Sequence, residues 1–290
     1  MRRIVSILLS GAFFFIHAAV QAAGPVSQAQ AAVAPPLTVA NQEYVFTSPP
    51  RETAEKGEEM YKPVAEMLTK ATGKKFVYKY PDNWLVYQSE MRAGKYDVIF
   101  DGPHFSGWRI RQLQHTPLVK LPQPHVWVVI ARADSPTIAS VKDLVGRKVC
   151  VHAPPNFGTL TLQSLFDNPS RQPYLVEIKG WKEAFQGMVA KRCDGTILPV
   201  TNLKNFDEDG KLAKVIHKHQ PYPNQAITAG PRITPDMRAR IIDALNAPEG
   251  KAATAALRER FTKGKDLVPA NSEEYMDVSL VLRNYWGFEF

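Results

Sequence analysis

The chain of 290 residues has few cysteines and lacks the short motifs of the common enzyme classes. Its two cysteines, Cys150 and Cys193, are too few for a disulfide-rich scaffold or a cysteine-based metal centre. The sequence contains no G-x-S-x-G elbow, no phosphate-binding P-loop, no H-E-x-x-H pair and no G-x-G-x-x-G fingerprint. These absences indicate that the protein is not an enzyme, holds no metal and needs no cofactor.

Long apolar runs are also scarce, since residues 4–20 form the only one that approaches the length of a membrane span. Arg2 and Arg3 precede this run, and the small residues Ala22 and Ala23 follow it. That order is typical of a cleavable secretory signal peptide, whereas a membrane anchor is the alternative. We therefore expect a signal peptide at 1–22, a disordered Ala/Gln/Pro-rich leader at 23–36, and export of the remaining chain to the periplasm.

The charge balance is mildly basic, with a formal net charge of +8 that falls to +6 when Arg2 and Arg3 are removed. Lysines and arginines are scattered among acidic residues and form no block. Dispersed charge of this kind excludes nucleic acid as the expected partner. Attraction of a small anion into a cleft fits the excess better.

The first half of the folded chain alternates strands and helices. Strands are expected at 43–48, 75–80 and 96–101, and helices at 53–72, 81–92 and 104–114. A proline-punctuated connection at 117–124 follows. This β-α-β-α-β-α order predicts a parallel, doubly wound sheet.

A second α/β unit covers about residues 130–222. Its expected strands are 126–131, 149–151, 174–178 and 195–200, with a capping box at 140–143 and helices near 156 and at 182–190. A strand at 225–229 leaves this unit, and helices follow at 234–245, 251–261 and 273–285. The order predicts an α/β fold of two doubly wound lobes: the first lobe at 37–128 and 226–290, the second at 129–225, with a two-segment hinge at 126–133 and 225–230.

Residues 147–166, RKVCVHAPPNFGTLTLQSLF, predict a buried strand, a turn at Pro154 and Pro155, and a helix that begins near Asn156. Unpaired N–H groups at a helix N-terminus favour an anion. An ordinary connection between a strand and a helix is the alternative.

In open α/β sheets ligands bind at the carboxyl ends of strands, so the residues that follow each strand are the candidate binding residues. Hydroxyl groups and a guanidinium can donate to an oxyanion, glycines admit a ligand to the backbone, and an indole N–H can donate while its ring packs. Each also has a structural alternative as a helix cap, a core residue or a surface residue. The candidates are Thr47, Ser48, Arg51, Trp84, Tyr87, Asp101, Gly102, Pro103, His104, Asn156, Phe157, Gly158, Thr159, Trp181 and Thr201.

The two cysteines fall on strands that a doubly wound order places side by side, about 4.8 Å apart. We therefore expect a Cys150–Cys193 disulfide. A free thiol that binds a trivalent arsenic oxyacid is the alternative.

Three segments, 94–103 (GKYDVIFDGP), 143–159 and 180–198, are similar in order and spacing to segments of the substrate-binding proteins of phosphate/phosphite/phosphonate ABC transporters. The resemblance covers essentially the whole mature chain and implies the type 2 periplasmic-binding fold. In that family a Ser-Thr-Ser type run wraps the phosphonate. The corresponding residues here are 156–159, of which Thr159 retains a hydroxyl, and Trp181 takes the place of the family's histidine.

The resemblance implies a monomeric periplasmic protein that captures a small oxyanion, of the phosphonate, phosphite or phosphate type, between two lobes and delivers it to a transporter permease. The alternative is a sensor accessory that binds an oxyanion such as arsenite and presents its closed form to a membrane histidine kinase.

Overall fold

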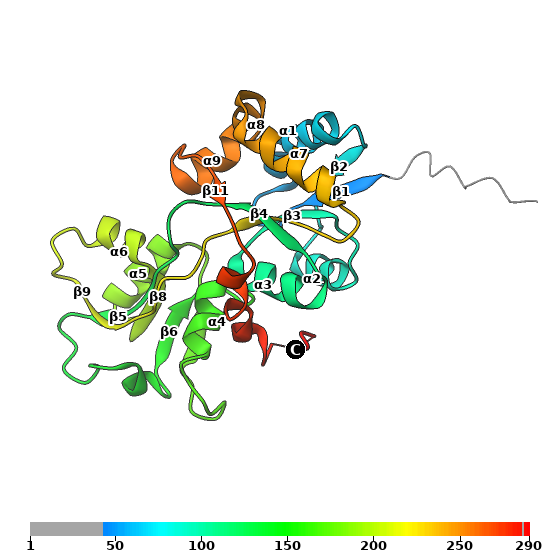
Figure 1. Cartoon of the computed structure of the whole chain (residues 1–290). Helices are drawn as coiled ribbons and strands as arrows, with labels where there is room; N and C mark the ends of the chain where they lie inside the picture. Colours follow the sequence, from blue (N-terminus) through cyan, green and yellow to red (C-terminus); the bar gives the residue numbers. More distant parts are fainter. Residues whose placement is uncertain (1–42, 286) are drawn as a thin grey trace, which may run out of the picture. The chain divides into compact units, whose positions relative to one another are not determined.

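The computed structural model of the protein describes residues 43–285 and 287–290. The predicted signal peptide and leader lie outside the described residues. The helices and strands gather around two separate sheets (Figure 1). Each sheet has helices on both faces, as the doubly wound prediction requires.

The first sheet has the strand order β11-β4-β10-β3-β1-β2. Its strands are β1 (Tyr44–Thr47), β2 (Phe76–Tyr78), β3 (Val98–Asp101), β4 (Thr116–Lys120), β10 (Ala226–Ala229) and β11 (Val268–Pro269). Its helices are α1 (Ala54–Thr72), α2 (Trp84–Arg92), α3 (Pro103–Gln112), α7 (Pro235–Asn246), α8 (Pro248–Ala253) and α9 (Ala255–Thr262). Helices α1, α7 and α8 lie on one side of this sheet and α2 and α3 on the other (Figure 1).

The second sheet has the order β7-β6-β8-β5-β9. Its strands are β5 (Trp127–Arg132), β6 (Lys148–Val151), β7 (Tyr174–Glu177), β8 (Gly195–Pro199) and β9 (Ala213–Lys218). The 3-10 helix η1 (Val141–Leu144) precedes β6, and the α-helices are α4 (Phe157–Gln163), α5 (Trp181–Val189) and α6 (Val200–Phe206).

The parallel order predicted for the first three strands is confirmed, but neither sheet is parallel throughout. Strands β1, β2 and β3 are parallel, but β10 is antiparallel to both β3 and β4. In the second sheet β6 is parallel to β7 and β8, whereas β5 is antiparallel to β8 and β9. The antiparallel strands are those next to the crossings between the sheets, where the chain enters from the other sheet and not through a βαβ connection.

Helix ends show why the local sequence folds as predicted. The Thr53 side chain accepts a hydrogen bond from the Lys56 amide at the start of α1, and Gly73 ends that helix with a φ of 69°. The buried face of α1 includes Tyr61, Val64 and Leu68, which are 1%, 0% and 1% exposed. The predicted capping box is present, because Ser140 and Asp143 exchange hydrogen bonds at the start of η1.

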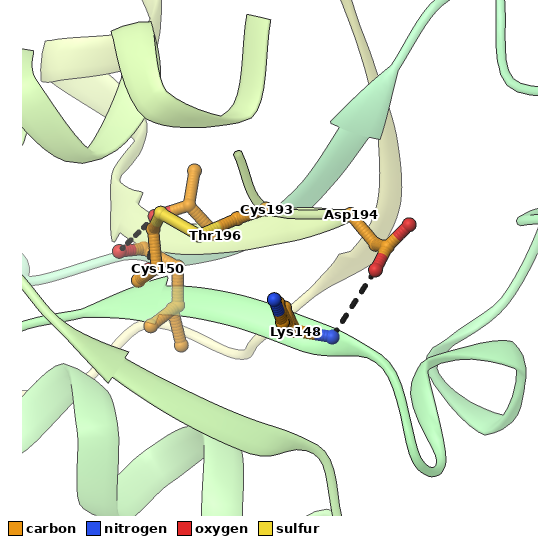
Figure 2. Close-up of a disulfide and its surroundings, with 6 residues drawn as sticks. Lys148, Cys150, Cys193, Asp194 and Thr196 are labelled. Atoms are coloured by element: carbon orange, nitrogen blue, oxygen red, sulfur yellow. Dashed lines mark hydrogen bonds between the residues drawn. A yellow bond between two sulfur atoms is a disulfide. The ribbon is translucent and has the colours of Figure 1, made fainter. Parts of the chain in front are cut away.

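The predicted disulfide is confirmed, which excludes the free thiol of the alternative. Cys150 lies on β6 and Cys193 just before the neighbouring strand β8, with Cα atoms 5.7 Å apart (Figure 2). The Thr196 hydroxyl donates to the Cys150 carbonyl oxygen at 2.7 Å, and the Lys148 amide donates to the Asp194 carboxylate at 3.1 Å. The bridge therefore joins two strands that are also held by hydrogen bonds.

The chain crosses between the two sheets at 121–126 and 219–225, and not at 126–133 and 225–230 as predicted. The predicted segments contain β5 and β10, whose residues pair inside the sheets. The two crossing segments pair with each other: His125 and Tyr222 exchange two backbone hydrogen bonds, and the Leu121 amide donates to the Gln225 carbonyl oxygen.

The C-terminal segment also differs from the prediction. The helix expected at 273–285 is replaced by two 3-10 turns, η2 (Glu273–Tyr275) and η3 (Val278–Leu282). Val278 packs in the cluster around Trp127 and Leu282 packs in the cluster around Phe105. The single helix expected at 251–261 is likewise divided between α8 and α9, and β4, β9 and β11 were not predicted. Trp286 lies outside the described residues.

Across the part of the chain that the structure describes, no helix is both long enough and apolar enough to cross a bilayer.

Candidate functional site

The first group of candidate residues follows strand β1. The Thr47 hydroxyl donates to the Lys79 carbonyl oxygen at 2.6 Å, so it ties β1 to the end of β2. Ser48 is 1% exposed, and its hydroxyl has no hydrogen-bond partner. The phenol hydroxyl of Tyr78 is also buried and without a partner. Burial raises the pKa of Tyr78.

Asp101, at the carboxyl end of β3, accepts hydrogen bonds from four donors. The Arg51 Nη2 donates to Oδ1 at 3.0 Å, and the Arg109 Nη1 donates to Oδ2 at 3.0 Å. The Tyr87 hydroxyl donates to Oδ2, and the Gly102 amide donates to Oδ1. Asp101 is fully buried and satisfied, so it holds the groups around it in position and is not itself a free acceptor.

Arg109 was not among the candidates, although its side chain is 0% exposed and forms an ion pair with Asp101. Its Nη2 also donates to the Thr228 hydroxyl of β10 at 3.1 Å. Arg51 and Arg109 carry two positive charges against the single negative charge of Asp101, which leaves a net charge of +1. An anion would neutralise this buried excess.

Arg51 has the geometry to bind such an anion. Its side chain is 22% exposed, and Asp101 fixes one edge of the guanidinium through Nη2. The Nη1 atom is buried and has no hydrogen-bond partner. A guanidinium held on one side by a carboxylate presents its remaining N–H groups in a fixed direction.

His104 lies in the first turn of α3, after the helix N-cap Gly102 and the first helical residue Pro103. Its Nε2 is 3.1 Å from the Pro155 carbonyl oxygen, so this nitrogen carries the proton and donates. Burial, with Arg51 and Arg109, lowers the pKa of His104 to about 3 against the opposing charge of Asp101. The ring is therefore neutral, and Nδ1 is a buried acceptor without a partner.

Gly102 is needed where these side chains meet. A Cβ atom at this position would lie 2.8 Å from the His104 ring and 3.6 Å from Arg51 Nη2. The absence of a side chain thus admits the imidazole and the guanidinium to the same place.

The helix end at 156–159 is already capped by the chain itself. The Asn156 Oδ1 accepts hydrogen bonds from the amides of Gly158 at 2.9 Å and Thr159 at 3.4 Å. The Thr159 hydroxyl donates to the His152 carbonyl oxygen at 2.6 Å. These groups were predicted to face an anion, but in this structure they are partnered within the second sheet's own loop.

Phe157 lies in a group of aromatic rings that come from both sheets. Its ring stacks on His104 with centroids 5.0 Å apart, and its centroid lies 4.9 Å from that of Tyr222. The rings of His125 and Trp127 meet it edge-on at 5.8 and 5.9 Å. Phe157 is 5% exposed.

Trp181 completes this group on the second-sheet side. Its ring lies 3.9 Å from that of His152 and 5.4 Å from that of Trp127. A Cβ on Gly158 would lie 2.6 Å from the Trp127 ring, so this glycine admits the indole. The hydrogen-bonding atoms Trp127 Nε1 and His152 Nε2 are buried without partners.

Two candidates lie elsewhere. Trp84 begins α2 and packs edge-on against Tyr87, with ring centroids 6.0 Å apart. Thr201 is exposed on α6, where its hydroxyl donates to the Asn202 side chain at 3.4 Å. Neither has a contact with the rings around Phe157 or with Arg51 among the interactions described above.

The site also includes residues that were not predicted. His152 directly follows β6, so the rule for strand ends could have identified it. His125 and Tyr222 lie in the crossing segments, which no strand pattern marks, and Trp127 was interpreted only as part of an apolar strand. Burial and Arg51 lower the pKa of His125 to about 4, so this imidazole is neutral too.

No cluster of three or more His, Cys, Asp or Glu side chains that could hold a metal occurs within the described ranges. A pocket of about 590 Å³ lies between residues 217–223 and the η2–η3 segment, and one of about 520 Å³ lies between α5 and α6. Neither pocket is lined by Ser48, Arg51 or His104. The site is therefore a closely packed set of buried polar groups and aromatic rings.

Comparison with known proteins gives one family and a set of similar structures. The family model described as "ABC transporter, phosphonate, periplasmic substrate-binding protein" matches residues 46–275. No curated protein matches the sequence.

The similar structures share the fold at low sequence identity. A Xanthomonas citri protein bound to ATP is 14% identical, with a TM-score of 0.64 over 84% of this chain and 98% of that one. PhnD1 from Prochlorococcus marinus in complex with methylphosphonate is 11% identical, with a TM-score of 0.58 over 83% and 97%. A binding protein component of an ABC phosphonate transporter from Pseudomonas aeruginosa is 13% identical, with a TM-score of 0.53 over 83% and 84%.

Proposed function

Because the chain belongs to the family of periplasmic substrate-binding proteins of phosphonate ABC transporters, we propose that it captures a small phosphorus oxyanion between its two lobes. Members of this family bind solutes for transport and are not enzymes. The proposed ligand is of the phosphonate, phosphite or phosphate type. The proposed partner is a transporter permease, to which a monomer delivers the ligand after export through the signal peptide at 1–22.

The observation that carries the proposal is the unpartnered Nη1 of Arg51. This buried guanidinium nitrogen lies in a cluster with a net charge of +1. Ser48, which like Arg51 follows strand β1, also has a buried hydroxyl without a partner. Buried donors without partners are rare in folded proteins, and a bound oxyanion would satisfy both groups. Charge-assisted hydrogen bonds of this kind are strengthened in a site that excludes water.

His104 supports phosphorus over sulfur as the central atom. Its Nδ1 is an acceptor, because Nε2 donates to Pro155. A ligand oxygen that meets this lone pair must therefore carry a proton. Phosphate, phosphite and phosphonates are partly protonated near neutral pH, whereas sulfate is not, so a sulfate would leave Nδ1 without a donor and lose affinity.

The proposal predicts a difference between two arginine variants. In isothermal titration calorimetry, the wild-type protein should bind phosphate, phosphite or methylphosphonate and reject sulfate. Arg51→Gln should weaken binding by at least about 10-fold, because a hydrogen bond to a charged group contributes about 1.5–3 kcal/mol. Arg240→Gln is the control, since Arg240 is 56% exposed on α7 and forms an ion pair with the exposed Asp236 of the same helix.

Wild-type affinity in the Arg51→Gln variant would overturn the assignment of the guanidinium. Binding of an amino acid or an organic cation, with no heat from any oxyanion, would overturn the ligand class.

A further inference from the structure

Phe157 occupies the place where the two lobes meet. It is the first residue of α4 in the second lobe, yet its nearest stacked neighbour is His104 of α3 in the first lobe, at an interplanar angle of 6°. Tyr222 and His125 reach it from the two crossing segments. One phenyl ring is thus surrounded by side chains from both lobes and from the connections between them.

Polar groups of the first lobe near this ring are shielded from solvent. Ser48 is 1% exposed and His104 is 3% exposed, so the unpartnered polar atoms of both residues are shielded from solvent. The Arg51 guanidinium and the His104 ring meet at Gly102, where a Cβ atom would lie 3.6 Å from Arg51 Nη2 and 2.8 Å from the His104 ring. The anion-binding groups therefore lie next to the ring stack and not at a distance from it.

The ring is held too firmly to move aside at low cost. It contacts four other rings, and each aromatic pair of this kind is stabilising beyond the area that it buries. The backbone beneath it is fixed as well, because Asn156 caps the first turn of α4 and Gly158 packs on the Trp127 ring. A ligand with a large organic group would have to displace this stack.

We propose that Phe157 is a specificity-determining residue that restricts the ligand to an oxyanion with a very small substituent. Hydrogen or hydroxyl on phosphorus fits, as in phosphite and phosphate. Propyl and phenyl groups do not. This inference rests on the proposed function, because it defines which members of the oxyanion class the same site accepts.

The test is a titration series with phosphite, phosphate, methylphosphonate, propylphosphonate and phenylphosphonate on three proteins. The wild-type protein should lose at least about 10-fold in affinity between phosphite and phenylphosphonate. Phe157→Ala should gain at least about 10-fold for phenylphosphonate over the wild type while phosphite affinity changes less. Phe206→Ala is the matched control, because this phenylalanine packs on Phe185 in the second lobe's other cluster and should keep the wild-type order.

Phe157→Leu is the second variant should Phe157→Ala fail to fold, because leucine keeps an apolar contact and still removes the ring. Equal affinity of the wild type for phosphite and phenylphosphonate would overturn the inference and leave the proposed function intact. So would folded Phe157 variants that bind phosphite but gain nothing for the larger ligands. Absence of oxyanion binding in every protein of the series would overturn the proposed function as well.

Discussion

Replacement of Asp101 by asparagine removes one negative charge from between two buried guanidinium groups. Arg109 is 0% exposed, and Asp101 is its only charged partner among the ion pairs of the described residues. Asparagine keeps the size of the side chain and can still accept from the Gly102 amide. The perturbation is therefore mainly electrostatic.

The expected cost is large because an uncompensated charge would remain inside the protein. Removing one member of a buried ion pair typically lowers the free energy of unfolding by about 3–5 kcal/mol. Asp101→Asn should fall in that range, whereas Arg109→Met should cost less, because the carboxylate then keeps its ion pair with Arg51. Asp101→Asn should also weaken oxyanion binding, because Arg51 loses the acceptor that fixes Nη2.

Urea unfolding at neutral pH measures each free energy, and the double variant makes the test specific. Asp101→Asn with Arg109→Met should cost less than the sum of the single changes, by about 2–3 kcal/mol, because both charges are then removed together. Asp266→Asn is the control. Asp266 is 54% exposed and its partner Lys251 is 45% exposed. Arg258 is 14% exposed, but it also donates to the carbonyl oxygens of Lys251 and Gly264, so the loss of Asp266 should change stability by less than about 1 kcal/mol.

Strict additivity of the two single changes, or a cost for Asp101→Asn as small as that of the surface control, would refute this account of the buried cluster. The side chains would then not act as the coupled unit that their distances indicate.

Three further predictions concern other parts of the chain. Replacing Cys150 and Cys193 together by serine removes a bridge with a sequence separation of 43, and urea unfolding should show a loss of up to about 4 kcal/mol; no loss would contradict the loop-closure estimate. Burial lowers the pKa values of His104 and His125 to about 3 and 4. Below pH 6.5 the unfolded chain takes up protons at these imidazoles, whereas the folded chain does not. The free energy of unfolding should therefore decrease as the pH is lowered, by about 1.4 kcal/mol per pH unit for each imidazole. The decrease in the free energy of unfolding between pH 6.5 and 5 should be smaller in His125→Asn. An unchanged pH profile in this variant would mean that His125 does not contribute to the pH dependence. Gly158→Ala places a methyl group 2.6 Å from a tryptophan ring and should cost about 1–3 kcal/mol in thermal or urea unfolding, whereas an unaffected variant would mean that the indole can move aside.

Much of the fold could be predicted because local signals and tertiary structure agree. The apolar face of α1, its threonine cap and its terminal glycine all mark the same helix. Strand β4 was missed because Pro117 indicates a loop. Its proline is tolerated inside the sheet, since the β10–β4 pairing shifts register between Ile227 and Thr228, and Pro117 lies opposite Thr228 at that irregularity.

The candidate site was less predictable, because hydrogen-bonding partners are chosen by tertiary packing. Sequence rules correctly direct attention to Asp101 at the end of a strand. They do not show that Arg109, two turns further along α3, and Arg51 from another loop both pair with its carboxylate. His125 and Tyr222 lie close together because the two crossing segments pair, and no hydrophobic periodicity in the sequence predicts that contact.

The strand order of the two sheets has a consequence for the way the chain acquires its structure. Every strand of the second sheet comes from the continuous stretch 127–218, together with both halves of the disulfide. The first sheet is interrupted: β10 lies between β3 and β4, so these two strands cannot be joined until residues 226–229 arrive. During synthesis and export from the N-terminus, the stretch 127–218 can therefore fold and form its disulfide before the first sheet is complete. The first sheet, which is followed by Arg51 and contains Asp101, lacks its central strand β10 until residues 226–229 have emerged.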